Sequence, residues 1–158
     1  MTARRGPLNY TTVIEPQKSA GECVAMLAAH GVTALGQTFD GKGTPTGLTF
    51  QIETPWGMRQ YSLPVNVKGT NAALARAYSR RDIPQRYANL DQAQRVAWRV
   101  MKDWLEVQLA LIQAGVAELN QVMLPYMHVD HGVTVWERWT ENEQLAISAR
   151  AGEGASHA

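Results

Sequence analysis

Apolar and polar residues alternate along part of the first half of the chain. Between residues 48 and 53 every second side chain is apolar, which predicts a strand with one buried face. Three further runs rich in β-branched and aromatic residues predict strands. Ser19 and Glu22 have the spacing of a capping box at the start of a helix that ends before Gly31. The expected order is β-α-β-β-β in a small antiparallel sheet, with strands at residues 8–15, 32–39, 48–53 and 58–63.

The second half of the chain follows the helical period instead. From Asp91 to about Ala114, apolar residues recur every three or four positions, which predicts one long amphipathic helix. Its apolar arc is wide, so we expect it to contact both the sheet and another element. Shorter helices are expected at residues 70–81, between Gly115 and Pro125, and at residues 136–147.

These patterns predict an α+β fold with a small antiparallel sheet followed by a helical C-terminal half. The chain of 158 residues has the usual length of one domain, which we place at residues 8–148. Residues 1–7 are expected to form a flexible N-terminal arm. Residues 149–158 are small and polar and are expected to form a disordered tail.

The single cysteine and the short apolar runs indicate where the chain is expected to work. Cys23 has no second cysteine to pair with, which favours a reducing compartment. The apolar run at residues 107–117 is too short to span a membrane, and no export signal follows Arg4 and Arg5. We therefore expect a cytoplasmic protein with no membrane partner.

The net charge of +1 hides two segments of opposite charge. Residues 59–102 contain nine Arg and Lys residues and two Asp residues, whereas residues 103–158 contain two arginines and eight acidic residues. A strongly basic segment favours an anionic partner such as nucleic acid.

Three short motifs carry a resemblance to a known family. They are Asn-Tyr-Thr-Thr at residues 9–12, Gln-Arg-Val-Ala-Trp-Arg at 94–99 with Lys-Asp-Trp at 102–104, and Met-Leu-Pro-Tyr at 123–126. In these motifs the chain resembles a family of small uncharacterised proteins encoded by tailed phages and prophages, over residues 8–127. The resemblance implies a phage or mobile element in a bacterial cytoplasm as the setting. The family has no catalytic motif to transfer to this chain.

No motif in the chain supports catalysis or a cofactor. Residues 36–42 have the spacing of a phosphate-binding loop, but Gly43 stands where Ser or Thr should bind Mg²⁺, and a strand follows in place of a helix. This segment is interpreted as a hairpin loop. His128, Asp130 and His131 are close enough in sequence to suggest a metal site, but a solvated turn is the preferred interpretation. We therefore expect no enzyme activity, no cofactor and no metal.

The basic segment carries the main functional hypothesis. Arg95, Arg99 and Lys102 share one face of the long helix, and their positive charges oppose the macrodipole of its first turns. A surface of this kind can neutralise phosphates, and exposed aromatic rings can stack on unpaired bases. We expect binding of single-stranded nucleic acid, or binding without sequence specificity. The predicted residues are Trp56, Arg59, Arg76, Arg80, Arg81, Arg86, Arg95, Arg99 and Lys102, with Tyr78 and Tyr87 as further stacking platforms.

Alternatives remain open at this point. Arg99 can pair with Asp103, Lys102 can pair with Glu106, and the acidic C-terminal segment can fold back on the basic one or complement it in a homo-oligomer. The chain can also be an inhibitor of host machinery that contacts a host or phage protein through Trp136 or Trp139. A pocket that sequesters a nucleotide and a small structural component of the phage are further alternatives.

Overall fold

The alternating residues of the first half build a three-stranded antiparallel sheet. The computed structural model describes residues 6–155, in which β1 (Ala34–Phe39), β2 (Pro45–Thr54) and β3 (Gly57–Ser62) follow one another as a meander. Leu35 lies opposite Phe50, and Phe50 lies opposite Tyr61. Directly opposed residues share one face of a sheet, so these side chains form its apolar face.

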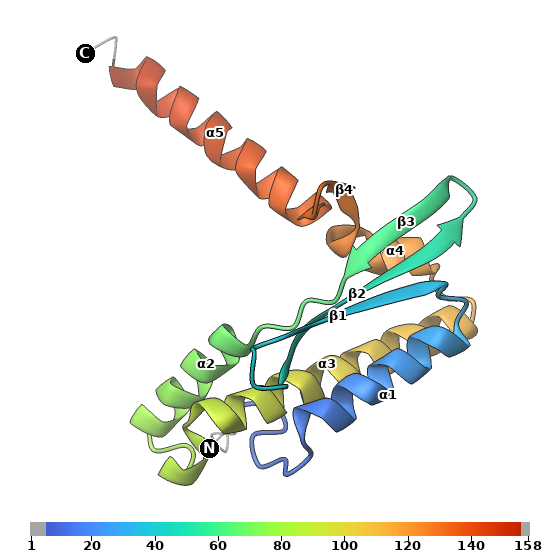
Figure 1. The fold of residues 1–158 in the computed structure, drawn as a ribbon. Helices are drawn as coiled ribbons and strands as arrows, with labels where there is room; N and C mark the ends of the chain where they lie inside the picture. The colour runs from blue at the N-terminus through green and yellow to red at the C-terminus, as the bar shows by residue number, and fades with distance from the viewer. Residues whose placement is uncertain (1–5, 156–158) are drawn as a thin grey trace.

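Two helices cover that face of the sheet. Figure 1 shows α1 (Pro16–Ala29) and α3 (Leu90–Gln113) side by side beneath the strands. Their buried side chains meet those of the sheet in the main core cluster, which includes Leu27, Phe50, Tyr61, Trp98 and Leu105. The Trp98 indole nitrogen donates a hydrogen bond of 2.7 Å to the carbonyl of Pro45, so this buried polar group is satisfied.

A second, smaller cluster joins α2 (Val67–Ser79) to the beginning of α3. Its buried residues are Leu74, Ala77, Ile83 and Ala93. The short 3₁₀ helix η1 (Gln85–Tyr87) connects the two helices, and the segment before α1 packs against the same cluster. Gln92 holds that segment, because its side-chain amide donates to the carbonyls of Tyr10 and Thr12 at 2.8 and 2.9 Å.

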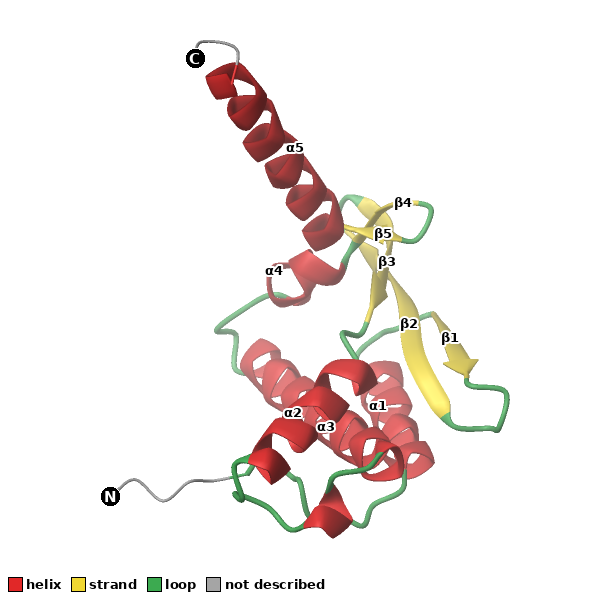
Figure 2. Cartoon of the chain, turned by 90° about the vertical axis from the view of Figure 1, so that its left-hand side faces the viewer, coloured by secondary structure: helices red, strands yellow, loops and turns green. Residues whose placement is uncertain are grey.

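The C-terminal part ends in a helix that projects from the body. After α3 the chain forms α4 (Leu119–Met123), η2 (Leu124–Tyr126) and a hairpin of β4 (His128–Asp130) and β5 (Val133–Thr134). Met127 makes an isolated bridge to Tyr61 of β3. The last helix, α5 (Val135–Ala155), packs against η2, β4 and β5 and then leaves the rest of the structure (Figures 1 and 2).

The predicted α+β class is confirmed, but the order of its elements is not the predicted one. The expected strand at residues 8–15 is wrong, because this segment forms turns and coil. Its apolar side chains do not form the buried face of a strand. Tyr10 packs in the second cluster, and Val13 is 86% exposed. The observed order therefore begins with α1, and the hairpin of β4 and β5 is an addition that the sequence did not predict.

Helix boundaries also differ from the predicted ones. The predicted capping box at Ser19 is wrong, because α1 already begins at Pro16 and Ser19 is buried inside the helix. Proline is well suited to the first helical position, where its missing N–H is not needed. Asn66 and Asn89 cap α2 and α3, so these helices begin at Val67 and Leu90 and not at the predicted residues 70 and 91. Helix α5 extends to Ala155, so residues 149–155 are helical although a disordered tail was expected there.

Residues 1–5 of the expected N-terminal arm and residues 156–158 of the expected tail lie outside the described residues. Within residues 6–155, none of the helices has the length and apolar character required to cross a membrane.

Candidate nucleic-acid interface

The basic face of α3 is neutralised by carboxylates from the N-terminal part of the chain. The Arg95 Nε atom lies 2.9 Å from Glu15 Oε1, and the Arg99 Nη1 atom lies 2.8 Å from Glu22 Oε2. Glu15 precedes α1 and Glu22 lies on it, so these ion pairs tie α1 to α3. The two guanidinium groups therefore contribute to the packing of the helices rather than to a free cationic surface.

Lys102 is neutralised within α3 itself. Its Nζ atom lies 2.6 Å from Glu106 Oε2 and 3.7 Å from Asp103 Oδ1. The hydrogen bond to Glu106 is the main cause that raises the pKa of Lys102. The side chains of Arg99 and Lys102 are only 16% and 15% exposed. The pairs of Arg99 with Asp103 and of Lys102 with Glu106, considered above as an alternative, are thus both present.

The acidic C-terminal segment does not fold back on the arginines of α2. Among residues 6–155, the ion pairs of α5 are those of Arg138, which lies 3.5 Å from Glu141 and 3.7 Å from Asp130. Helix α5 points away from α2 (Figure 1). The intramolecular part of that alternative therefore holds only for the carboxylates of α3.

Trp56 and Arg59 lie apart from the other predicted residues. Trp56 occupies the turn between β2 and β3 and is 67% exposed, and Figure 1 shows this turn far from α2. Arg59 follows on β3, where its guanidinium donates to the carbonyl of Met58 at 3.1 Å. These two residues do not share a surface with the arginines of α2.

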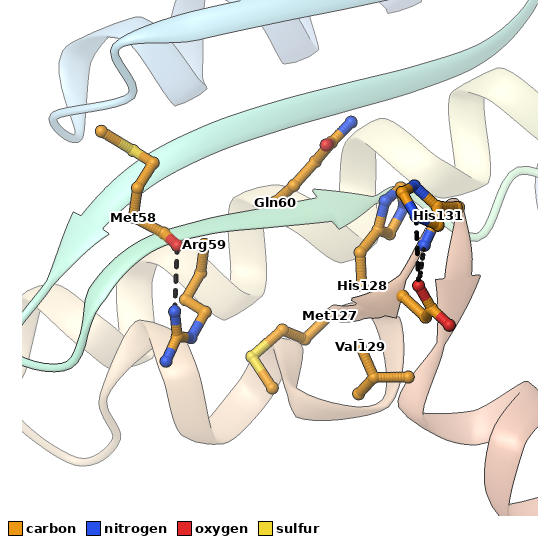
Figure 3. Close-up of a pocket in the computed structure, with 9 residues that line it drawn as sticks. Met58, Arg59, Gln60, Met127, His128, Val129 and His131 are labelled. Atoms are coloured by element: carbon orange, nitrogen blue, oxygen red, sulfur yellow. Dashed lines mark hydrogen bonds and ion pairs between the residues drawn. The ribbon is translucent and has the colours of Figure 1, made fainter.

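Arg59 lines an open cleft of about 610 Å³ between β3 and the hairpin of β4 and β5. Figure 3 shows Arg59 and His128 on opposite sides of this cleft. The Nε2 atom of His128 lies 2.6 Å from the Ser62 hydroxyl oxygen and is hydrogen-bonded to it. No cluster of three metal-ligating side chains occurs among the described residues. The link between Ser62 and His128 instead holds the hairpin on β3.

The segment with the spacing of a phosphate-binding loop covers the end of β1 and the start of the hairpin loop that connects β1 to β2. Asp40 caps this loop, because its carboxylate accepts hydrogen bonds from the backbone N–H groups of Lys42 and Thr44 at 2.8 and 3.1 Å. The bond from Lys42 is the main cause that lowers the pKa of Asp40. The backbone N–H groups that would cradle a phosphate are thus turned toward a carboxylate.

Four arginines remain together in sequence and exposed to solvent at the end of α2. We call them the α2-end arginines: Arg76, Arg80, Arg81 and Arg86. Their positions are the last turn of α2, its C-cap, the next residue and η1. Arg76 and Arg80 are four residues apart and so share one helix face. Tyr78, 43% exposed, belongs to the same turn.

Carboxylates neutralise only part of this group. The Arg80 Nε atom lies 2.9 Å from Asp82 Oδ2, yet the Arg80 side chain is still 57% exposed. The other three α2-end arginines have no ion pair with any described residue. Arg86 lies over the ring of Tyr87, with its guanidinium carbon 4.8 Å from the ring centroid. Tyr87 also packs edge-on against Tyr10, so it supports Arg86 rather than offering a free ring.

Arg81 has a backbone conformation that arginine rarely adopts. Its φ angle is +60°, and it occupies the position after the C-cap of α2. The Arg81 N–H donates to the carbonyl of Tyr78 at 2.8 Å, and the Asp82 N–H donates to that of Ala77 at 2.9 Å. These two bonds form a Schellman motif, in which glycine usually occupies the left-handed position. An arginine there costs about 1 kcal/mol relative to a relaxed backbone.

Sequence reasoning identified all four of these arginines but not the turn that presents them. Glycine and asparagine, the usual signals for such a turn, are absent from residues 79–82. Comparison of the chain with models of protein families, with curated proteins and with solved structures finds no match.

Proposed function

We propose that the chain binds nucleic acid, either single-stranded or without sequence specificity, through the α2-end arginines. The observation that carries this proposal is Arg81. A glycine at this position would remove the strain of the left-handed backbone conformation. Residues with a strained backbone tend to occur at functional sites. The presence of a long cation at this position is therefore best explained by a contact that the cation makes.

The geometry of the segment suits phosphate groups. Three of the four arginines are free of carboxylate partners among residues 6–155, and guanidinium groups bind phosphate oxygens through two parallel hydrogen bonds. Tyr78, in the last turn of α2, has an exposed side chain on which an unpaired base can stack. Because Arg80, Arg81 and Arg86 lie at or beyond the C-cap of α2 rather than along the helix, we propose contact with the backbone rather than with base edges.

Part of this positive charge also has a structural explanation. Cations in the last turn of a helix interact favourably with its macrodipole, which accounts for Arg76 and Arg80. It does not account for the strained position of Arg81 or for Arg86 beyond the helix. We propose a phage accessory protein as the setting, in keeping with the resemblance described above.

The experiment compares the wild-type chain with the variant Arg81→Gly. Glycine removes the cation and also relaxes the backbone, so the variant is expected to fold at least as well as the wild type. Binding to a labelled single-stranded oligonucleotide is measured by fluorescence anisotropy over a range of salt concentrations. Each phosphate contact to a single strand contributes about 0.7 to the slope of log affinity against log salt. We expect Arg81→Gly to bind more weakly and to lower this slope by about that amount.

The matched control is Arg95→Gln. Arg95 has the same charge, but its guanidinium is engaged with Glu15, so its loss should leave the slope unchanged. No binding by the wild-type chain at low salt would overturn the proposal. An equal loss of affinity in the two variants would show that total charge, and not the α2-end arginines, governs binding.

A further inference from the structure

Helix α5 exposes apolar side chains that the body of the protein does not cover. Trp136 and Trp139 stack on each other with ring centroids 5.2 Å apart, and they are 56% and 53% exposed. Ile147, two turns further along, is also exposed. From Glu143 onward, no described residue of α5 forms a hydrogen bond or ion pair with another element. Most of this helix is thus unpartnered within the described chain (Figure 2).

The uncovered part of α5 runs from Glu143 to Ala155, and an isolated helix of about 12–15 residues is marginal in water. The last turns of α5 also contain Gly152 and Gly154, and glycine lowers helix stability by about 1 kcal/mol per residue relative to alanine. Two exposed tryptophans are rare on a surface that meets only water. We therefore expect another polypeptide to cover the exposed side of α5.

The residues on one side of α5 define what can cover it. A stripe of residues spaced by three or four positions runs along the helix. We call it the α5 stripe: Trp136, Trp139, Glu143, Ala146, Ile147 and Arg150. It contains one acidic and one basic residue, placed three residues on either side of the central pair of Ala146 and Ile147. The part of the stripe from Glu143 to Arg150 is therefore complementary to itself when it is turned end to end.

We propose that α5 pairs in antiparallel orientation with α5 of a second copy of the chain, about a two-fold axis between Ala146 and Ile147. This axis brings Glu143 of each copy opposite Arg150 of the other, so that two equivalent ion pairs form. In a parallel pair Glu143 would face Glu143 and Arg150 would face Arg150, and like charges would repel. Charge complementarity thus selects the second copy and its direction.

The sizes of the side chains agree with the same arrangement. The same axis places Trp139 of each copy opposite position 154 of the other, which is a glycine. A residue without a side chain leaves room for the indole ring. Large and small residues on facing positions let two helices interdigitate. The antiparallel pair also keeps the two bodies at opposite ends of the helices.

Charge reversal tests the pairing. The wild-type chain, treated with nuclease and kept at moderate salt so that nucleic acid does not bridge copies, is expected to be a dimer in sedimentation equilibrium. Glu143→Arg and Arg150→Glu each place like charges together at both equivalent sites, and each should raise the dimer dissociation constant roughly tenfold or more. The double variant restores opposite charges and should restore the dimer.

Matched controls lie on the other side of the helix. Glu141→Arg changes the charge by the same amount outside the α5 stripe and should leave the dimer intact. Likewise Ile147→Gln should weaken the dimer, whereas Leu145→Gln, at an equally exposed position off the stripe, should not. A monomeric wild-type chain at every concentration would overturn the proposal, as would a dimer that tolerates both single charge reversals.

Disulfide trapping tests the direction of pairing. Cys23 is buried, and burial is the main cause that raises its pKa to about 12, so introduced cysteines are the reactive ones. A mixture of Glu143→Cys and Arg150→Cys chains should form the mixed disulfide on mild oxidation. Disulfides within each variant alone, in the absence of the mixed product, would show a parallel pair and overturn the proposed arrangement.

Discussion

Arg81 shows how the stability and the function of one residue can oppose each other. Its left-handed backbone disfavours any side chain with a Cβ atom, while the proposed phosphate contact requires a long cation. Because these two requirements belong to different states of the protein, they can be measured separately. The stability requirement applies to the free chain, and the binding requirement applies only when nucleic acid is present.

We predict that Arg81→Gly stabilises the free chain. Relief of the left-handed position is worth about 1 kcal/mol, and the greater freedom of glycine in the unfolded chain offsets part of it. A net gain of about 0.5 kcal/mol is expected, which corresponds to a rise in Tm of about 1–2 °C for a chain of this length. Differential scanning calorimetry without nucleic acid measures it.

The comparison variant for this prediction is Arg76→Gly. Arg76 lies inside α2 with helical geometry, so glycine there should lower the stability by about 1 kcal/mol. If both glycine variants lower Tm to the same extent, then Arg81 is not strained, and the main support for the proposed binding site is lost.

Individual side chains also explain why the sequence overestimated the basic surface. The pattern of α3 correctly placed Arg95, Arg99 and Lys102 on one face. The partners of Arg95 and Arg99 are Glu15 and Glu22, which are 80 and 77 residues away. Ion pairs at this separation depend on how α1 packs against α3, which no local pattern reveals. Only the pairs within α3 were predictable from spacing.

At the scale of elements, α5 has the capping box that the sequence suggested for α1. Glu137 accepts hydrogen bonds from the N–H and the hydroxyl of Thr134, and the Glu137 N–H donates to the Thr134 hydroxyl. The same Thr-x-x-Glu spacing is present in the sequence. These bonds stabilise the charged form of Glu137, and the N–H of Thr134 is the main cause that lowers its pKa below the usual 4.5.

This capping box makes the start of α5 sensitive to pH. Because the pKa of Glu137 is lower in the folded chain than in the unfolded chain, folding is favoured when this carboxylate is charged. The contribution is complete above pH 4.5 and is lost as the pH falls through the lowered pKa. We predict that Glu137→Gln accelerates amide hydrogen exchange in the first turn of α5 at pH 6. After correction for intrinsic rates, the difference should shrink toward pH 3. A difference that does not depend on pH would contradict the assigned role.

The regular elements were predictable where one pattern dominated. The alternation of apolar residues in β2 and their helical period along α3 correctly predicted both elements. The predicted boundaries are within three residues for β2 and within one residue for α3. The segment at residues 8–15 has the composition of a strand, but no neighbouring strand is available to it, and composition alone cannot supply one. The hairpin of β4 and β5 was missed because strands of three and two residues are too short for a period to emerge.

At the scale of the whole molecule, α3 connects the two core clusters. Its first turns supply Ala93 to the smaller cluster with α2, and its middle supplies Trp98 and Leu105 to the main cluster with the sheet. Because one continuous helix belongs to both clusters, we expect the unfolding of either cluster to destabilise the other. We therefore expect the α2-end arginines to belong to the same cooperative unit as the sheet, although no described residue of α2 is part of the main cluster.

This connection predicts how a cavity in the smaller cluster propagates. Leu74 is fully buried in α2, and Leu74→Ala should destabilise the chain by about 2–5 kcal/mol. If α3 couples the two clusters, the amides of β2, which belong to the main cluster, lose hydrogen-exchange protection by the same free energy as those of α2. The control Leu90→Ala, at an exposed position at the start of α3, should change protection by less than about 1 kcal/mol. Loss of protection confined to α2 would show that the smaller cluster opens independently. The proposed binding surface would then be a separate, less stable unit.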